Sequence, residues 1–139
     1  MNQTTIFWPM IAQVALVYAM YGVLWSRRRR AVREGTTRPN QFKDRTAEPD
    51  ISISAANNIL NQFELPVLFY AVCLALYVTN GVSYVALVFA WLFVAARIVH
   101  AVIHVTMNRV RYRSPAFLAG VIMLGLMWIW FAAHIAGAV

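Results

Sequence analysis

The sequence predicts an all-α membrane protein: a single domain over residues 1–139 that folds as a bundle of four transmembrane helices. Three observations predict it. The chain is 61% hydrophobic and only 12% charged, which is too apolar for a water-soluble globule of this size. It contains four apolar segments that each reach the ~20 residues needed to cross a bilayer as a helix. All its basic residues except Arg97 lie in two segments that adjoin these spans, which is the pattern that orients membrane proteins.

The first predicted span covers about residues 5–25 and is followed by Arg27–Arg30. A cleaved signal peptide carries its basic residues before the apolar run, so this segment should be retained. Basic loops favour the cytosol, and we therefore expect an outside amino terminus and a cytosolic loop over residues 26–51.

The second predicted span, about residues 52–79, is longer than a bilayer crossing requires. Asn57, Asn61 and Glu64 recur at i, i+4 and i+7, so they share one helix face. Pro66 cannot donate a hydrogen bond to the carbonyl of Gln62, which predicts a bend in the helix there. The span also contains the single cysteine, Cys73, which we interpret as a buried apolar residue.

The third predicted span, about residues 83–106, carries charge inside the membrane. Arg97, His100, His104 and Asn108 are spaced 3, 4 and 4, so they form one stripe along the cytosolic half of this helix. An unpaired arginine at that depth is costly, and such residues normally face the interior of the bundle.

Glu64 is the one acidic residue of the sequence at the depth of Arg97. We therefore expect the polar face of the second span to meet the polar face of the third, either within one chain or across a subunit boundary. An ion pair between Glu64 and Arg97 that only fixes helix register would be a structural alternative.

The fourth predicted span covers about residues 115–138. Ser114 is placed to cap its first turn and Pro115 stands at the first helical position. This span runs outward, so Arg109, Arg111 and Arg113 share the cytosolic side with the first basic loop and both termini lie outside. His134, near the outer end, is interpreted as interfacial.

The same residues are also compatible with two other functions, metal binding and nucleic-acid binding. His100 and His104 have the i, i+4 spacing of two metal ligands, with Glu64 as a third, but the segment lacks the adjacent glutamate of zinc peptidases. The net charge of +7 fits a nucleic-acid partner less well than it fits membrane orientation, since the basic segments adjoin the spans. We expect neither a metal nor a nucleic acid.

Two short motifs in these spans resemble those of the MAPEG superfamily, the membrane-associated proteins in eicosanoid and glutathione metabolism. In its second span the family has Asn-x-x-Glu shortly before a proline and an aromatic residue. In its third span the prostaglandin synthase branch has Arg-x-x-His-x-x-x-Tyr, then an Arg-Ser pair nine residues after the tyrosine. The matching positions here are Asn61, Glu64, Pro66 and Phe69 for the first motif, and Arg97, His100, His104 and Arg113-Ser114 for the second.

The chain departs from the family pattern at three positions. His104 replaces the family tyrosine, and Asn57 and Leu60 stand where arginines that help to hold the glutathione carboxylates are common. These losses favour a catalytically silent MAPEG-like structural or partner-binding subunit, whereas the retained Arg113-Ser114 pair favours an enzyme.

The resemblance implies a multi-pass homotrimer, in the inner membrane if the cell is bacterial, that binds glutathione between neighbouring subunits near the cytosolic face. It implies glutathione transferase or peroxidase activity on lipophilic substrates, which would enter from the lipid. Arg113 and Ser114 would be catalytic, since a nearby cation and a hydroxyl donor favour the thiolate. The residues expected to bind glutathione are Asn57, Asn61, Glu64, Arg97, His100 and His104.

Overall fold

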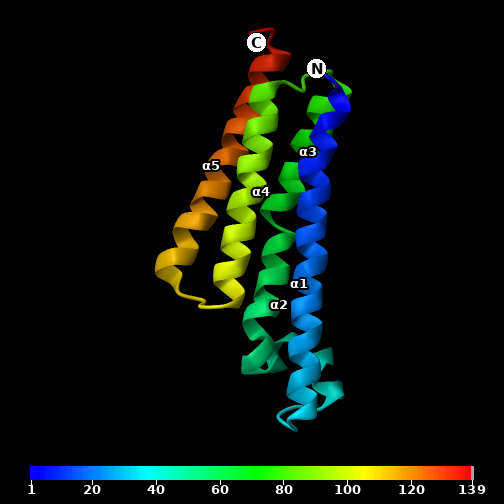
Figure 1. Ribbon diagram of the computed structural model, residues 1–139, viewed down its shortest axis with the longest axis vertical. Helices are drawn as coiled ribbons and strands as arrows, with labels where there is room; N and C mark the ends of the chain where they lie inside the picture. Colours follow the sequence, from blue (N-terminus) through cyan, green and yellow to red (C-terminus); the bar gives the residue numbers. More distant parts are fainter. Residues whose placement is uncertain (139) are drawn as a thin grey trace.

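The computed structural model describes residues 1–138 and shows an elongated bundle of helices (Figure 1). No strand occurs in this part of the chain. The helices are α1 (Phe7–Arg33), α2 (Asp50–Gln62), α3 (Leu65–Val78), α4 (Tyr84–Val105) and α5 (Val110–Ile135), with short 3₁₀ turns η1 (Gln3–Ile6), η2 (Pro39–Lys43) and η3 (Arg45–Ala47).

Four helical segments are long and apolar enough to cross a membrane, which confirms the four predicted spans. They are Gln3–Arg33, Asp50–Val78, Tyr84–Val105 and Val110–Ile135. Large apolar side chains also face outward, among them Tyr18, Val78 and Ile129, which are 73%, 75% and 67% exposed. An apolar surface of this extent is unfavourable in water and is typical of a protein that contacts lipid.

The core is divided along the axis of the bundle into two clusters. One is built from α3, α4 and α5 around Phe69 and Phe93, whose stacked rings have centroids 4.5 Å apart. The other packs α1 and α2 against α4 around Leu24, Ile59 and Ala101. Buried side chains therefore tie every span into one unit.

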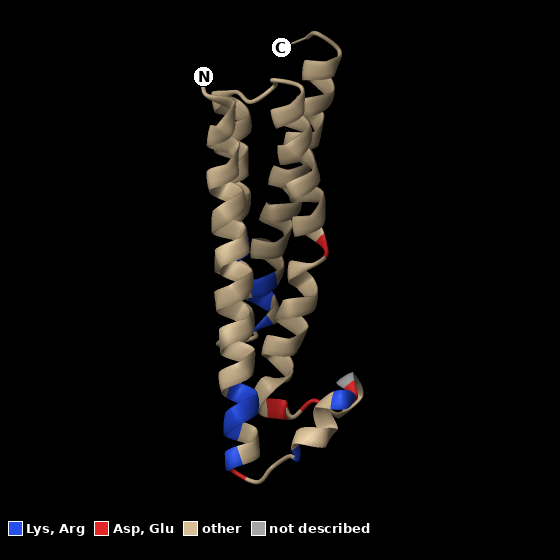
Figure 2. Ribbon diagram, turned by 90° about the vertical axis from the view of Figure 1, so that its right-hand side faces the viewer, with Lys and Arg blue, Asp and Glu red and all other residues tan. Residues whose placement is uncertain are grey.

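Both termini lie at one end of the bundle, which we call the terminal end (Figure 1). Lysines and arginines gather toward the opposite end, which we call the basic end (Figure 2). The two basic connections therefore share a side of the bundle, as the predicted orientation requires. That this side is the cytosol remains a prediction.

The first helix extends further than the sequence predicts. The apolar run stops near residue 25, but α1 continues to Arg33, so the four consecutive arginines are helical. Arginine is a good helix former, and basic residues in the last turn complement the negative end of the helix dipole. The predicted loop over residues 26–51 accordingly shrinks to the connection 34–49.

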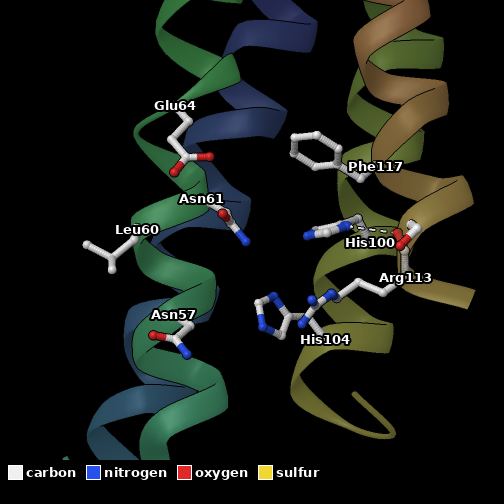
Figure 3. A pocket seen from close by; sticks show the side chains of 9 residues that line it. Asn57, Leu60, Asn61, Glu64, His100, His104, Arg113 and Phe117 are labelled. Carbon is white, nitrogen blue, oxygen red and sulfur yellow. Dashed lines mark hydrogen bonds between the residues drawn. The ribbon is translucent and has the colours of Figure 1, made fainter. Parts of the chain in front are cut away.

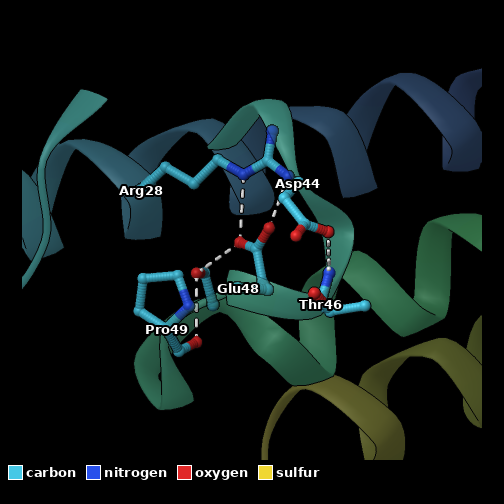
Figure 4. Close-up of polar contacts among 6 residues, drawn as sticks. Arg28, Asp44, Thr46, Glu48 and Pro49 are labelled. Carbon is cyan, nitrogen blue, oxygen red and sulfur yellow. Dashed lines mark hydrogen bonds and ion pairs between the residues drawn. The ribbon is translucent and has the colours of Figure 1, made fainter. Parts of the chain in front are cut away.

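An ion pair holds this connection against α1. Arg28 donates to Glu48 through Nε at 3.0 Å and through Nη2 at 2.6 Å (Figure 4). Ser52 in the first turn of α2 also donates to the Glu48 carboxylate, at 2.5 Å. Burial acts to raise the pKa of Glu48, but these hydrogen bonds outweigh it and the pKa is lowered. Nearby, the Thr46 backbone N–H lowers the pKa of the Asp44 carboxyl.

The second span contains a complete break where a bend is predicted. α2 ends at Gln62, and Glu64 lies outside the helical region at φ −95° and ψ −99°. Pro66 then falls within the first two positions of α3, where a missing N–H is tolerated. The proline therefore begins a new helix and does not bend the old one.

The start of the last span differs from the prediction at Ser114-Pro115. α5 begins at Val110, after Arg109, so Ser114 does not cap it and Pro115 lies inside the helix. Asn108 does not continue the α4 stripe either, because it sits in the connection with φ 46°. Arg113 Nη1 donates to Asn108 Oδ1 at 2.8 Å. This bond ties the first turns of α5 to the connection.

The connection at the terminal end is equally tight. Asn80 adopts φ 56°, and His134 of α5 faces the carbonyl of Thr79 at 3.2 Å. A Cβ at Gly81 would lie 2.4 Å from His134 Cδ2, so any larger residue there would force the His134 ring to move.

Candidate functional site

A pocket of about 460 Å³ lies between α2 on one side and α4 and α5 on the other (Figure 3). We call it the α2–α5 pocket. Its volume falls within the ~300–1,000 Å³ of small-molecule sites. The residues that line it are Asn57, Leu60, Asn61, Glu64, His100, His104, Arg113, Ser114 and Phe117.

The α2 wall of the pocket carries the polar face predicted from the sequence. Asn57 and Asn61 point from successive turns of α2 toward the opposite wall, and Glu64 lies above them at the helix break (Figure 3). The carboxylate of Glu64 is exposed. Because the helix stops two residues earlier, this carboxylate stands beyond the last turn of α2.

The opposite wall combines α4 and α5. His100 and His104 come from successive turns of α4, and their rings lie 5.6 Å apart at an angle of 78°. The first turns of α5 add Arg113, Ser114 and Phe117. His100 Nδ1 faces the carbonyl oxygen of Arg113 at 3.3 Å, which fixes α4 to α5 beside the pocket. The two predicted polar faces thus meet within one chain.

Arg97 behaves differently from the prediction. Its side chain is fully buried and does not line the pocket. Among the described residues no ion pair joins it to Glu64; its Nη2 donates to the backbone carbonyl of Asn61 at 2.7 Å. The reason is the break in the second span. The last carbonyls of α2 lack helical donors, and a cation at a helix C-terminus is favourable.

A family model described as the MAPEG family matches residues 5–133. The chain belongs to the MAPEG family. The match extends from the start of the first span into the last turns of α5, so it includes every residue of the α2–α5 pocket. Comparison with curated proteins gives no match, and comparison with solved structures gives none.

Sequence reasoning missed a buried chain of amides that crosses this MAPEG bundle. Gln13 of α1 donates to Gln62 at 2.9 Å, Gln62 donates to Asn58 at 3.1 Å, and Asn58 Nδ2 lies 3.4 Å from His104 Nδ1. All four side chains are buried. One signal could have found the chain, because Gln13 is the lone amide in an otherwise apolar first span, and a polar residue in a span normally bonds a neighbouring helix.

A second cavity, of about 420 Å³, lies where α1 meets η2 and α2. It brings Arg28, Lys43 and Phe42 close to Asn57 and Leu60, which line both cavities. None of the described side chains of the predicted loop 26–51 lines the α2–α5 pocket itself. Within a single chain, therefore, the loop arginines whose side chains the structure describes do not replace the two that MAPEG proteins commonly carry in the second span.

The structure gives no support for a metal site at His100, His104 and Glu64. Among residues 1–138 no three histidine, cysteine or acidic side chains gather as they would around an ion. Cys73 is buried in the core, as predicted.

Proposed function

We propose that this MAPEG protein binds glutathione in the α2–α5 pocket and activates its thiol for transfer to lipophilic electrophiles. One observation carries the proposal: the two walls of the pocket differ in chemistry. The α2 wall offers a carboxylate and two amides, and the other wall offers a cation, a hydroxyl and two imidazoles. Glutathione has an ammonium group, two carboxylates, two peptide groups and a thiol, so it requires both kinds of partner.

Each wall has a defined task in this proposal. Glu64 accepts hydrogen bonds from the ammonium group, and Asn57 and Asn61 bond the peptide groups. Arg113 and Ser114 face the thiol. A cysteine-type thiol has a pKa near ~8.5 and is mostly protonated at neutral pH, and an adjacent cation lowers that pKa. A charged donor such as Arg113 contributes more than the neutral hydroxyl of Ser114.

The transfer step is a nucleophilic substitution. The thiol gives its proton to a base, the thiolate sulfur forms a bond to the electrophilic carbon, and the leaving group departs with the electron pair of the broken bond. Leu60 and Phe117 give the pocket an apolar part, which suits an electrophile that arrives from the lipid.

We further propose that the protein is a homotrimer, as the MAPEG resemblance implies, with glutathione held between neighbouring subunits. The wide apolar surface that the isolated chain exposes supports this proposal, since subunit contacts as well as lipid would cover it.

A catalytically silent subunit is the second candidate. Two observations favour it. Asn57 and Leu60 leave the α2 wall without arginine, and Arg97 holds the carbonyl of Asn61 instead of facing the pocket. In that case the buried polar residues would only join the helices.

Calorimetry on the purified protein in detergent tests the proposal. Glutathione should bind, and an analogue with a hydroxyl in place of the thiol should bind more weakly at a pH where the thiol is ionised. Arg113→Leu should weaken glutathione binding about tenfold or more, which corresponds to ~1.4 kcal/mol.

Arg111→Leu is the matched control, because Arg111 lies on the same helix turn but does not line the pocket. It should leave the affinity unchanged. Absence of any binding heat for glutathione in the parent protein at several temperatures would reject the proposal and favour the silent subunit.

A further inference from the structure

The two histidines of the pocket are bonded through the same ring nitrogen to partners of opposite kinds. His100 Nδ1 faces the carbonyl oxygen of Arg113 at 3.3 Å. A carbonyl oxygen accepts hydrogen bonds and cannot donate them. Nδ1 of His100 must therefore carry the proton, and in the neutral ring the lone pair lies on Nε2.

The partner of His104 is the side-chain amide of Asn58, whose orientation is set by its other bonds. Asn58 Oδ1 accepts from Gln62 Nε2 at 3.1 Å, and Gln62 Oε1 in turn accepts from Gln13 Nε2 at 2.9 Å. Asn58 consequently directs its NH₂ group at His104 Nδ1, at 3.4 Å. Nδ1 of His104 then accepts, and the proton of the neutral ring lies on Nε2.

Burial makes these assignments effective. Gln13, Asn58 and Gln62 are at most 1% exposed, and His100 and His104 are 2% and 3% exposed. Water therefore does not compete for the bonded atoms of the amide chain, and a single amide that turned around alone would lose its buried bonds. The chain of amides acts as a unit because each amide orients the next.

We infer that the two histidines are held in opposite tautomers, so that the lone pair of the neutral His100 ring lies on Nε2 and His104 presents a donor at Nε2–H. His100 Nε2 is buried and has no hydrogen-bond partner among the described residues, and the His100 ring extends from α4 across the pocket toward Asn61 (Figure 3). Gln13, Gln62 and Asn58 are positioning residues that act through His104.

For the thiol, the inference rests on the proposed function. His104 Nε2–H donates a hydrogen bond to the glutathione thiolate beside Arg113. A histidine can thus supply the donor where the family tyrosine would supply a hydroxyl, but only in the tautomer that Asn58 imposes.

Nitrogen NMR on ¹⁵N-histidine-labelled protein in detergent tests the inference without glutathione. Spectra are recorded at mildly alkaline pH, where the neutral imidazole predominates, and the signals are assigned with His100→Phe and His134→Phe variants. We expect His100 to be protonated at Nδ1 and His104 at Nε2. The same tautomer at both histidines, or fast exchange between the two tautomers at His104, would overturn the inference.

A matched pair of variants tests the role of the amide chain. Asn58→Asp replaces the NH₂ donor by a carboxylate oxygen, so His104 Nδ1 should gain a proton. Asn57→Asp introduces the same charge one residue earlier, outside the chain, and should leave Nδ1 unprotonated. If Asn58→Asp does not fold, Gln62→Leu serves instead, because it frees the Asn58 amide and should produce mixed tautomers at His104. An unchanged His104 signal in the folded variant would show that the chain of amides does not set the His104 tautomer.

The outcomes separate this inference from the function on which it rests. Opposite tautomers in a protein that gives no binding heat with glutathione would reject the proposed function and leave the assignment of the histidines intact. Glutathione binding in a protein whose two histidines share one tautomer would reject the assignment of the histidines and leave the proposed function intact.

Discussion

Removing the ion pair between Arg28 and Glu48 should detach the 34–49 connection from α1. Nε and Nη2 of Arg28 donate to the two carboxylate oxygens of Glu48, at 3.0 and 2.6 Å, and the Glu48 side chain is only 4% exposed against 32% for Arg28. Hydrogen bonds between charged groups contribute ~1.5–3 kcal/mol when shielded. Because Arg28 partly faces water, we expect a coupling energy of about 1–2 kcal/mol.

A double-mutant cycle with Arg28→Gln and Glu48→Gln measures this coupling. Equilibrium unfolding in mixed detergent micelles gives the free energy of each variant. The pair Arg30–Glu34 is the matched control, since it is as short, at 2.7 Å, but its side chains are 68% and 46% exposed. Its coupling should be much smaller and should disappear at high salt. Equal couplings for the two pairs would refute the argument from burial.

The same pair should make stability depend on pH. Folding lowers the pKa of Glu48, because the hydrogen bonds from Arg28 and Ser52 outweigh the opposing effect of burial. A carboxyl whose folded pKa lies below its unfolded value of ~4.3 stabilises the fold fully above that value. The contribution is lost as the pH falls through the folded pKa. Glu48→Gln should remove this part of the acid sensitivity, so a parallel acid titration of the two proteins checks the sign.

Three further predictions address the membrane, the buried charge and the thiol. In a cysteine-free protein, Tyr84→Cys should react with an impermeant maleimide on intact cells and Asn40→Cys should not; the reverse pattern would invert the orientation. Glu64→Gln and Arg97→Leu should change the free energy of unfolding additively, within roughly 0.5 kcal/mol, since no ion pair joins these two residues; a larger coupling would mean that they meet. Arg113→Leu should raise the pKa of bound glutathione by about 1–2 units, read from thiolate absorbance in the ultraviolet; an unchanged value would remove Arg113 from the mechanism.

The sequence predicted the four spans from apolar length and much of the polar lining of the pocket from residue spacing. Apolar length identifies each span, and the i, i+4, i+7 spacing of Asn57, Asn61 and Glu64 places them on one face whatever their partners are. The face of His100 and His104 follows in the same way. Since each face needs a polar partner in the bundle, their meeting across the α2–α5 pocket was predictable.

The sequence did not predict the partner of Arg97, the start of α5 or the amide chain. Each depends on geometry that residue spacing does not contain. Arg97 bonds a backbone carbonyl, and every residue has one, so no side-chain pattern identifies it. Ser114-Pro115 is a typical helix start, but α5 begins at Val110 and includes both residues, with Arg113 bonded to Asn108 of the preceding connection. Asn58 and Gln62 were adjacent to predicted site residues but on another face of α2.

The break between α2 and α3 has an evolutionary consequence. Nη2 of the buried Arg97 has an acceptor because the interrupted helix leaves the carbonyl of Asn61 free. A sequence change that joined α2 and α3 into one continuous helix would occupy that carbonyl with a backbone N–H and leave the guanidinium without its acceptor. Selection should therefore act on the two features jointly, and among related sequences the arginine and the proline that begins α3 should be inherited or lost together.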